Sequence, residues 1–353
     1  MSNLLPIIVI VGIGIVLVAL TRRGVLSQRR APLTLQSREA SGPDRELVLR
    51  ILRAIRTRNL TAVGAAVLGV VLAVVVHQGF TKAAGLPLVL APGAAGVLST
   101  LVFLWWPLPH EARSTSQLKH DQICADLTPR TKGMFGPGWG VALPSVLSAI
   151  TVVGLLLGGI FSSPDERGLY RQLHYVTHSG ASIDANSVVT ENLVGYGSSG
   201  PFPGWYYGIP VGAVVVLGFM LTMWALNSNV RRPSLRSLEL REFDKAVRTH
   251  NGYVLSTGFS ALLCFQLVPL LAMAAISTYG ASYNAIYEVG QRFDAGADIF
   301  RDPWLATLGW TMGGLCMLLL IIGVLLLGHL VGWMAAAYGT EVQHQSKGRE
   351  MPA

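Results

Sequence analysis

The sequence predicts an all-α, polytopic membrane protein with seven transmembrane helices. Three observations support this prediction. Hydrophobic residues make up 51% of the 353 residues and charged residues only 13%, which is typical of multi-pass membrane proteins. Seven apolar stretches reach the roughly 20 residues needed to cross a hydrocarbon core about 30 Å thick. The basic residues that flank these stretches fall mostly on one side of the predicted membrane.

The predicted spans are continuously apolar, which favours helices over the alternating strands of a barrel. The first stretch ends in Thr21-Arg22-Arg23 and lacks a small-residue cleavage site, so we expect a retained span and not a signal peptide. The seven spans lie near residues 4–20, 60–79, 86–106, 139–162, 206–226, 254–276 and 304–326.

The distribution of lysine and arginine predicts the orientation. Segments 21–59, 107–138, 227–253 and 339–353 together hold 22 of these residues, whereas 80–85, 163–205 and 277–303 hold five. Because basic loops stay in the cytoplasm, we expect the N-terminus outside, the C-terminus inside and the plasma membrane as the location. The basic residues flank apolar spans and form no continuous basic face, so nucleic acid is not an expected partner.

The spans divide into two membrane units joined by a single helix. The first unit is residues 1–106, with spans one to three and the basic cytoplasmic loop 21–59, and the second is 206–339, with spans five to seven. Between them lie a cytoplasmic connector (107–138), span four (139–162) and an exterior loop (163–205). Residues 340–353 form a cytoplasmic tail.

A short sequence repeat relates the two units. Residues 53–59 read Arg-Ala-Ile-Arg-Thr-Arg-Asn and residues 245–251 read Lys-Ala-Val-Arg-Thr-His-Asn, each just before a span that rises from the cytoplasm. This predicts parallel halves in a 3+1+3 layout, although biased composition can also produce such a match. The layout is similar in topology to the SWEET family of seven-span sugar uniporters. The long basic loop 21–59 and the exterior segment 163–205 depart from that family.

The first copy of the repeat belongs to a short cationic amphipathic helix at residues 45–58. Arg45, Arg53 and Arg56 lie largely opposite its apolar face and are candidate contacts to anionic lipid at the cytoplasmic face. An in-plane membrane helix and a cytoplasmic extension of span two both fit this pattern. The sidedness of the basic residues favours the extension.

The predicted membrane interior carries no charged residue in the central part of any span, which disfavours an ion-driven mechanism. Gln266, near the middle of span six and three residues before Pro269, is the most polar side chain there. It is a candidate for a substrate path. An interhelical hydrogen bond is the favoured alternative.

Two groups of residues stand out in the exterior segments. Tyr279, Tyr283 and Tyr287 are four residues apart and would share one face of a helix. Together with Trp205 they could form a stacking surface for a ligand. An interfacial aromatic belt is the favoured interpretation, because Trp205 falls where span five begins.

His174 and His178 have the i, i+4 spacing with which two imidazoles on a helix can bind one metal ion. The glutamate of the H-E-x-x-H motif is absent and no third ligand is defined by spacing. A polar loop helix is therefore favoured. We expect no metal and no other cofactor.

No catalytic motif is present. The chain lacks a P-loop, a G-x-S-x-G sequence and a catalytic Cys/His pattern, so we expect no enzymatic activity. The leading hypothesis is a permease-like protein or permease subunit for a neutral or amphipathic solute. The alternative is an accessory or sensing subunit that acts through a membrane-protein partner or through a second copy of itself.

Overall fold

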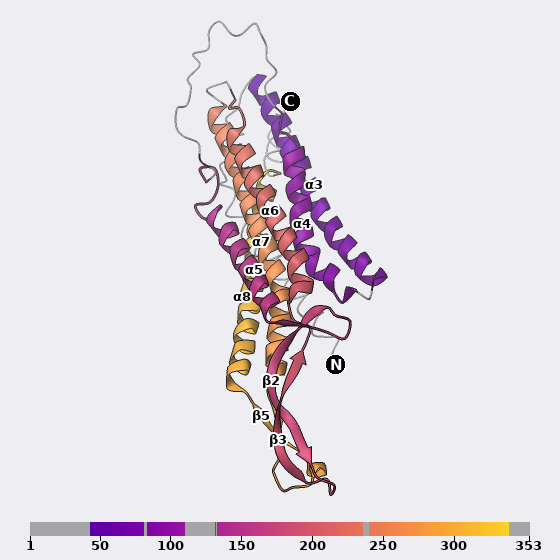
Figure 1. Cartoon of the computed structure of the whole chain (residues 1–353). Helices are drawn as coiled ribbons and strands as arrows, with labels where there is room; N and C mark the ends of the chain where they lie inside the picture. Colours follow the sequence, from indigo (N-terminus) through magenta and orange to yellow (C-terminus); the bar gives the residue numbers. More distant parts are fainter. Residues whose placement is uncertain (1–42, 81–82, 110–130, 132, 236–239, 339–353) are drawn as a thin grey trace, which may run out of the picture.

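A computed structural model describes residues 43–80, 83–109, 131, 133–235 and 240–338. In this part of the chain, six helices standing side by side are long and apolar enough to cross a membrane (Figure 1). They are α3 (Pro43–Gly79), α4 (Leu86–Trp105), α5 (Ala142–Ile160), α6 (Trp205–Arg231), α7 (Arg241–Ala281) and α8 (Pro303–Ala336). The protein is therefore a mostly helical, membrane-embedded, multi-pass protein. The span predicted at 4–20 lies outside the described residues, and each of the other six predicted spans overlaps one of these helices.

The amphipathic segment 45–58 and the second predicted span form one continuous helix, α3. Its backbone therefore agrees with an extension of span two and not with a separate in-plane helix. Beyond Leu60 the apolar side chains of α3 are widely exposed, for example Val67 at 56% and Val71 at 49%. Such a surface is suited to lipid.

A tight turn joins α3 to α4. Ala84 and Gly85 have positive φ angles of 48° and 83°, a backbone conformation that glycine adopts without steric cost. The hydroxyls of Tyr206 and Tyr207, at the start of α6, donate hydrogen bonds of 2.9 and 2.6 Å to the carbonyl oxygens of Ala83 and Ala84. The turn is therefore held against α6.

Helix α7 is the central helix of the bundle and packs against α4, α5, α6 and α8. Its 41 residues give a length of about 60 Å at 1.5 Å per residue. This is about twice the thickness of the hydrocarbon core. Helix α7 therefore extends beyond the membrane as well as through it.

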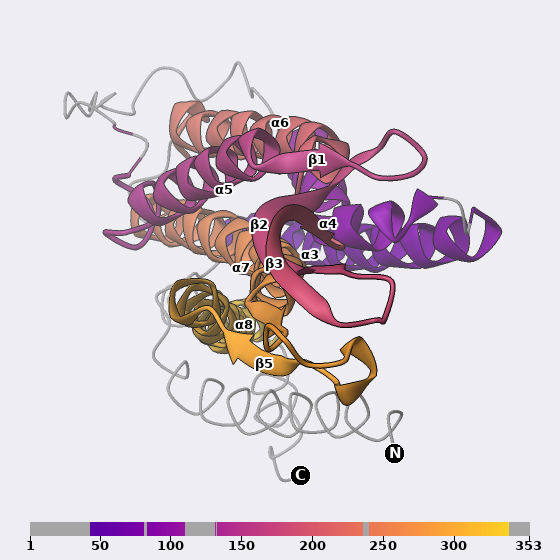
Figure 2. The ribbon, with the colours of Figure 1, turned by 60° about the horizontal axis from the view of Figure 1, so that its bottom comes forward.

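The all-α prediction is wrong for two segments that follow α5 and α7. The first contains the antiparallel strands β1 (Ser162–Pro164), β2 (Tyr170–Ile183) and β3 (Val189–Ser199). The second contains β4 (Tyr283–Ile286), a short 3-10 helix (Phe293–Ala295) and β5 (Asp298–Arg301). We call the end of the bundle that carries these strands the strand end, and the opposite end, where α3 and α7 begin, the basic end (Figures 1 and 2).

The physical reason for the strands lies in side-chain type and turn chemistry. The segment 170–199 is rich in Tyr, Val and Thr, which favour strands. Between β2 and β3, the carboxylate of Asp184 accepts hydrogen bonds from the backbone N–H groups of Asn186 and Val188 at 2.8 and 2.9 Å. This turn reverses the chain into a hairpin.

Side chains join the two β segments into one unit. The amide of Asn192 in β3 donates to the carbonyl of Tyr287 at 2.6 Å and accepts from its N–H at 2.9 Å. The Asn284 side-chain oxygen accepts from the His178 N–H at 3.1 Å. The hairpin and the loop after α7 thus support each other, far from the basic end.

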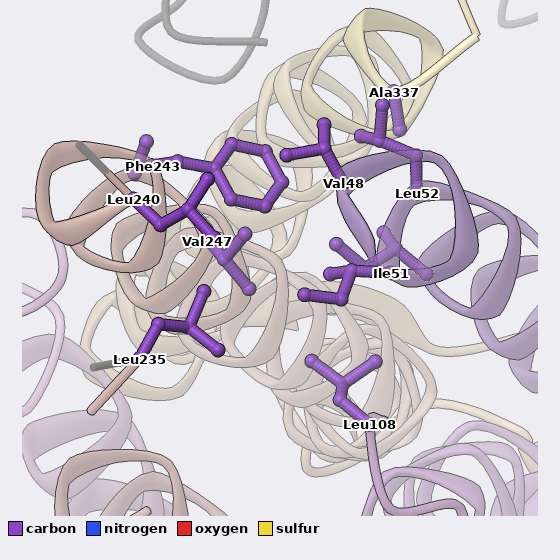
Figure 3. Close-up of a cluster of buried hydrophobic side chains, with 11 residues drawn as sticks. Val48, Ile51, Leu52, Leu108, Leu235, Leu240, Phe243, Val247 and Ala337 are labelled. Carbon is purple, nitrogen blue, oxygen red and sulfur yellow. The ribbon is translucent and has the colours of Figure 1, made fainter. Parts of the chain in front are cut away.

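At the basic end, apolar side chains from α3 and α7 meet in one buried cluster (Figure 3). Val48, Ile51 and Ile55 of α3 face this cluster, as do Leu240 just before α7 and Phe243 and Val247 within it. Each of the three α3 residues lies 192 positions before its counterpart in the second set, and the two copies of the sequence repeat have the same offset. The buried face of both segments therefore has the same phase.

Candidate functional site

The two copies of the repeat are in direct contact. The guanidinium of Arg58 donates to the side-chain oxygen of Asn251, and the amide of Asn59 lies 3.3 Å from Nε2 of His250. Arg58 is equivalent to His250 in the repeat, and Asn59 to Asn251. The contact is thus reciprocal: the first position of each pair contacts the second position of the other copy. A two-fold axis produces this pattern.

The arginine shared by both copies has a common role. Arg248 donates to the carbonyls of Asn229, Val230 and Arg232 at 3.1, 2.9 and 2.7 Å, where α6 ends. Arg56 donates to the carbonyl of Ala337, where α8 ends, at 2.7 Å. In both cases a cation satisfies carbonyl groups at a helix C-terminus, where the helix dipole favours positive charge.

A cavity of about 230 Å³ lies beside this contact. Its lining comes from α3, α4, α6 and α7 and from the chain that follows α4 and α6. The lining residues are Arg58, Phe103, Leu104, Trp106, Pro107, Leu108, Ala225, Ser228, Asn229, Arg232, Asn251 and Leu255. Polar groups and apolar side chains therefore share one cavity.

The charges around the cavity do not balance. Among the described residues, the buried cluster holds the guanidinium groups of Arg58, Arg232 and Arg248 but only one carboxylate, that of Asp244. Asp244 accepts a 2.7 Å hydrogen bond from Arg248, and Arg232 lies 3.8 Å away from its other oxygen. Three cations against one anion leave a net charge of about +2 in a largely buried site.

Both cavity arginines also have unused hydrogen-bond donors. Arg58 is 4% exposed, and its Nε has no hydrogen-bond partner within the described part of the chain. The same holds for Nε and Nη1 of Arg232, whose side chain is 9% exposed. Burial lowers the pKa of Arg232, and nearby Arg248 lowers it further, while Asp244 raises it. The cavity is therefore suited to an anion.

Gln266, the candidate for a substrate path, is 1% exposed and contacts α4. Its amide donates to the Val89 carbonyl at 2.7 Å and accepts from the Gly93 N–H at 2.9 Å. These two backbone groups would bond to each other in a regular helix, and Pro92 between them lacks an N–H. The geometry matches the interhelical alternative, and Gln266 is not among the residues that line the cavity.

The three tyrosines predicted to share a helix face are divided between different elements, because α7 ends at Ala281. Tyr279 is in α7, Tyr283 is in β4 and Tyr287 follows β4. The rings of Tyr279 and Tyr283 still meet edge to face at 5.6 Å, whereas Tyr287 stacks on Phe293 at 4.8 Å. The prediction of one helical face is therefore wrong.

Trp205 begins α6 and packs on α5. A Cβ atom added at Gly159 would lie 2.5 Å from the Trp205 ring, so only glycine fits beneath it. Trp205 therefore belongs to helix packing at the strand end. It is separate from the Tyr279–Tyr283 pair.

His174 and His178 lie on strand β2, so the prediction of a loop helix is wrong. His174 stacks on Tyr196 of β3 at 5.0 Å. Four residues along a strand span about 13 Å, too far for two imidazoles to meet one ion. Within the described residues no group of three or more His, Cys, Asp or Glu side chains could hold a metal.

The candidate lipid contacts differ in their surroundings. Arg45 and Arg53 are exposed on α3. Arg56 is half-buried, and besides its bond to Ala337 it lies 5.6 Å from the ring centroid of Tyr338. Arg45 and Arg53 are therefore the two that can reach a membrane surface freely.

Sequence reasoning singled out Arg58 only as part of the repeat and missed Arg232, Asn229 and Asp244. Arg232 directly precedes Pro233, and the 3.6-residue period of α7 places Asp244 and Arg248 on one face. These signals indicate a helix end and an ion pair. They do not indicate a cavity, because its second wall comes from α3 and α4.

Comparisons with known proteins add no family. The sequence matches no protein-family model, and neither the curated proteins nor the solved structures include a match. The topological similarity to the SWEET family therefore stays a prediction. What the fold and the site define is a class: a multi-pass membrane protein with a cationic cavity between its helices.

Proposed function

We propose that this protein is a non-enzymatic permease-like protein, or a permease subunit, that binds an amphipathic solute between its two membrane units. The observation that carries the proposal is the position of the cavity. Its walls come from α3 and α4 of the first unit and from α6 and α7 of the second. Transporters built from parallel repeats commonly hold their substrate at the interface between the repeats.

The lining favours an amphipathic solute over a neutral one. Two arginines and two asparagines provide polar contacts, whereas Phe103, Leu104 and Leu255 are apolar. A solute with a charged head and an apolar body satisfies both sets of groups. A neutral sugar would leave Arg58 without a counter-charge from the described residues and Arg232 with only the carboxylate of Asp244, which is shared with Arg248.

The proposal includes seven spans in the plasma membrane, with the N-terminus outside and a 3+1+3 repeat. The reciprocal contact of Arg58 and Asn59 with His250 and Asn251 supports the repeat. Helices α3 and α7 also run in the same direction (Figure 1). Arginine-rich segments gathered at the basic end support its location in the cytoplasm.

The test is transbilayer movement in proteoliposomes. Fluorescent alkyl probes with a neutral, a carboxylate and a phosphate head group are placed in both leaflets, and an impermeant quencher reports how fast the inner population reaches the surface. We expect faster movement than in protein-free vesicles for at least one probe. We also expect loss of that gain in Ser228→Phe, which fills the cavity without removing a charge.

If no probe moves faster than in protein-free vesicles, the permease proposal is wrong and an accessory or sensing subunit remains. A specific observation favours that second candidate. The β unit at the strand end exposes large apolar side chains, including Tyr196 at 77% and Ile299 at 75%. Exposed apolar groups of this kind are typical of a surface that meets a partner. Recovery of a second membrane protein with the purified chain, dependent on residues 170–199, would support this candidate.

A further inference from the structure

The net charge of the cavity points to the chemistry of what it binds. Burial and the nearby Arg232 both lower the pKa of Arg58, and the one described carboxylate beside Arg232, that of Asp244, is shared with Arg248. An uncompensated buried charge costs several kcal/mol per ion. Something other than the described side chains must therefore offset part of this cost.

The aromatic contact at Arg58 is too weak to do so. Its guanidinium carbon lies 4.4 Å from the ring centroid of Phe103, a cation–π geometry. Such a contact is much weaker than pairing with a full negative charge. This offsets part of the cost for one arginine and none for Arg232.

The unused donors select an oxyanion. A guanidinium presents its N–H groups as a planar fork that matches the oxygens of a carboxylate or a phosphate. Two guanidinium groups that share one cavity match a group with three or more acceptor oxygens and a full negative charge. Side chains of Ser228, Asn229 and Asn251 add further polar contacts in the same lining.

The remaining lining indicates that the anion is attached to an apolar chain. Phe103, Leu104, Trp106, Leu108 and Leu255 border the cavity beside the arginines. Trp105, next to this lining, is 83% exposed, and Trp106 is 40% exposed, as expected for residues at a membrane interface. A head group held by the arginines could thus leave its chains in the adjoining leaflet.

We propose that this cavity is a phosphate-binding site, with Arg58 and Arg232 as its two cationic ligands, and that the phosphate is the head group of a phospholipid. The inference rests on the proposed function because it concerns the same cavity, but it requires only binding and no transport. This site is distinct from Arg45 and Arg53, which lie exposed on α3 and stay candidate contacts to the membrane surface.

The test is lipid retention by purified full-length protein, measured by native mass spectrometry. Phosphatidylglycerol is compared with diacylglycerol of the same chains, and inorganic phosphate is added separately in a thermal-shift titration. We expect phosphatidylglycerol to bind and diacylglycerol not to bind. Binding of inorganic phosphate with equal affinity would support the phosphate site and overturn its assignment to a lipid. Binding of neither phosphate compound, or equal binding of diacylglycerol, would overturn the proposal.

Variants locate the binding. Loss of a charge-assisted hydrogen bond costs about 1.5–3 kcal/mol, so Arg58→Gln and Arg232→Gln should each weaken binding about tenfold or more. Arg167→Gln, which changes an exposed arginine between β1 and β2 at the opposite end of the bundle, is the control and should change little. The melting temperature of each variant is measured alongside, because Arg232→Gln also removes the 3.8 Å ion pair with Asp244. Equal loss in Arg167→Gln would contradict the site.

The two proposals fail separately. Phosphatidylglycerol binding without transbilayer movement of any probe would refute the permease and leave the phosphate site. Movement of the neutral probe together with no binding of phosphatidylglycerol or phosphate would support the permease and refute the phosphate site.

Discussion

Gly252 and Gln266 are both held by close contact with the backbone of a neighbouring segment. At Gly252, a Cβ atom would lie 1.6 Å from the carbonyl oxygen of Phe135, which belongs to the chain before α5. The side-chain amide of Gln266 forms hydrogen bonds with two backbone groups of α4. Each residue therefore fixes how another segment sits against α7.

Gly252→Ala should lower the free energy of unfolding by about 1–3 kcal/mol, because the added methyl group collides with a backbone atom that cannot rotate away. Gly64→Ala is the matched control, since nothing lies within 4 Å of a Cβ atom there. It should be neutral or stabilise by up to about 1 kcal/mol. Thermal unfolding in detergent checks both variants, and similar melting temperatures for the two would contradict the close approach.

Gln266→Leu keeps the side-chain volume but leaves the Val89 carbonyl and the Gly93 N–H without their partner. We expect a loss of about 1–3 kcal/mol in the same unfolding measurement. Thr307→Val is the control, because the Thr307 hydroxyl bonds only to a carbonyl within its own helix. A Gln266→Leu protein of unchanged stability but altered probe movement would instead favour the substrate-path hypothesis.

At the scale of elements, side chains add to the backbone hydrogen bonds that join the hairpin to the loop after α7, such as the bond from the Val189 N–H to the Gln291 carbonyl at 2.8 Å. Asn192 provides both a donor and an acceptor to the backbone of Tyr287. Asp165, between β1 and β2, accepts from the N–H groups of Leu169 and Arg167 at 2.9 and 2.8 Å. It also forms an ion pair with Arg171.

Asn192→Ala should loosen the loop after α7 near Tyr287, because two hydrogen bonds are lost together while the backbone bonds between Val189 and Gln291 and between Ser187 and Phe293 remain. We expect faster amide hydrogen exchange in residues 283–301, with the exchange of α6 and α7 unchanged. Asn186→Ala, in the turn of the same hairpin, is the control. Unchanged exchange in residues 283–301 of Asn192→Ala would show that other contacts hold the loop.

The turn at Asp165 should depend on pH. The hydrogen bond from the Leu169 N–H, followed by those from Arg171 and Arg167, lowers the pKa of this carboxyl below its usual value of 3.8. A depressed pKa in the folded state stabilises the turn above about pH 4, and this contribution is lost as the pH falls through the folded-state value. The protection factors of residues 162–172, which compare the measured exchange rates with the intrinsic rates at the same pH, should therefore fall at acidic pH. Asp165→Asn should show lower protection factors at neutral pH and little further change on acidification.

At the scale of the whole molecule, the arrangement of the helices makes the topology testable. With native cysteines replaced, Glu191→Cys on β3 should react with an impermeant maleimide from outside intact cells. Arg53→Cys on α3 should react only after the membrane is opened. A tag at the N-terminus should be accessible from outside if residues 4–20 span the membrane. Protection of that tag would contradict seven spans with the N-terminus outside.

The apolar stretches could be predicted because burial in lipid requires only a sufficient length of hydrophobic residues, a property of each segment by itself. The strands were missed because an exterior segment between two spans was treated as a loop. The turn at Asp184 and the Val and Thr residues around it were the available signal. The prediction that three tyrosines share one helix face was wrong for a related reason. The spacing of Tyr279, Tyr283 and Tyr287 does not show that α7 ends at Ala281.

The sequence by itself determined that this chain is embedded in a membrane, where the six described apolar helices lie and which end of the bundle is basic. These properties follow from local hydrophobicity and charge. Only the tertiary structure decided that Arg58 and Arg232, 174 positions apart, line one cavity with more positive than negative charge around it. The physical reason is that a charge balance depends on which side chains lie within a few ångströms of one another, and helix packing, not sequence spacing, sets those distances.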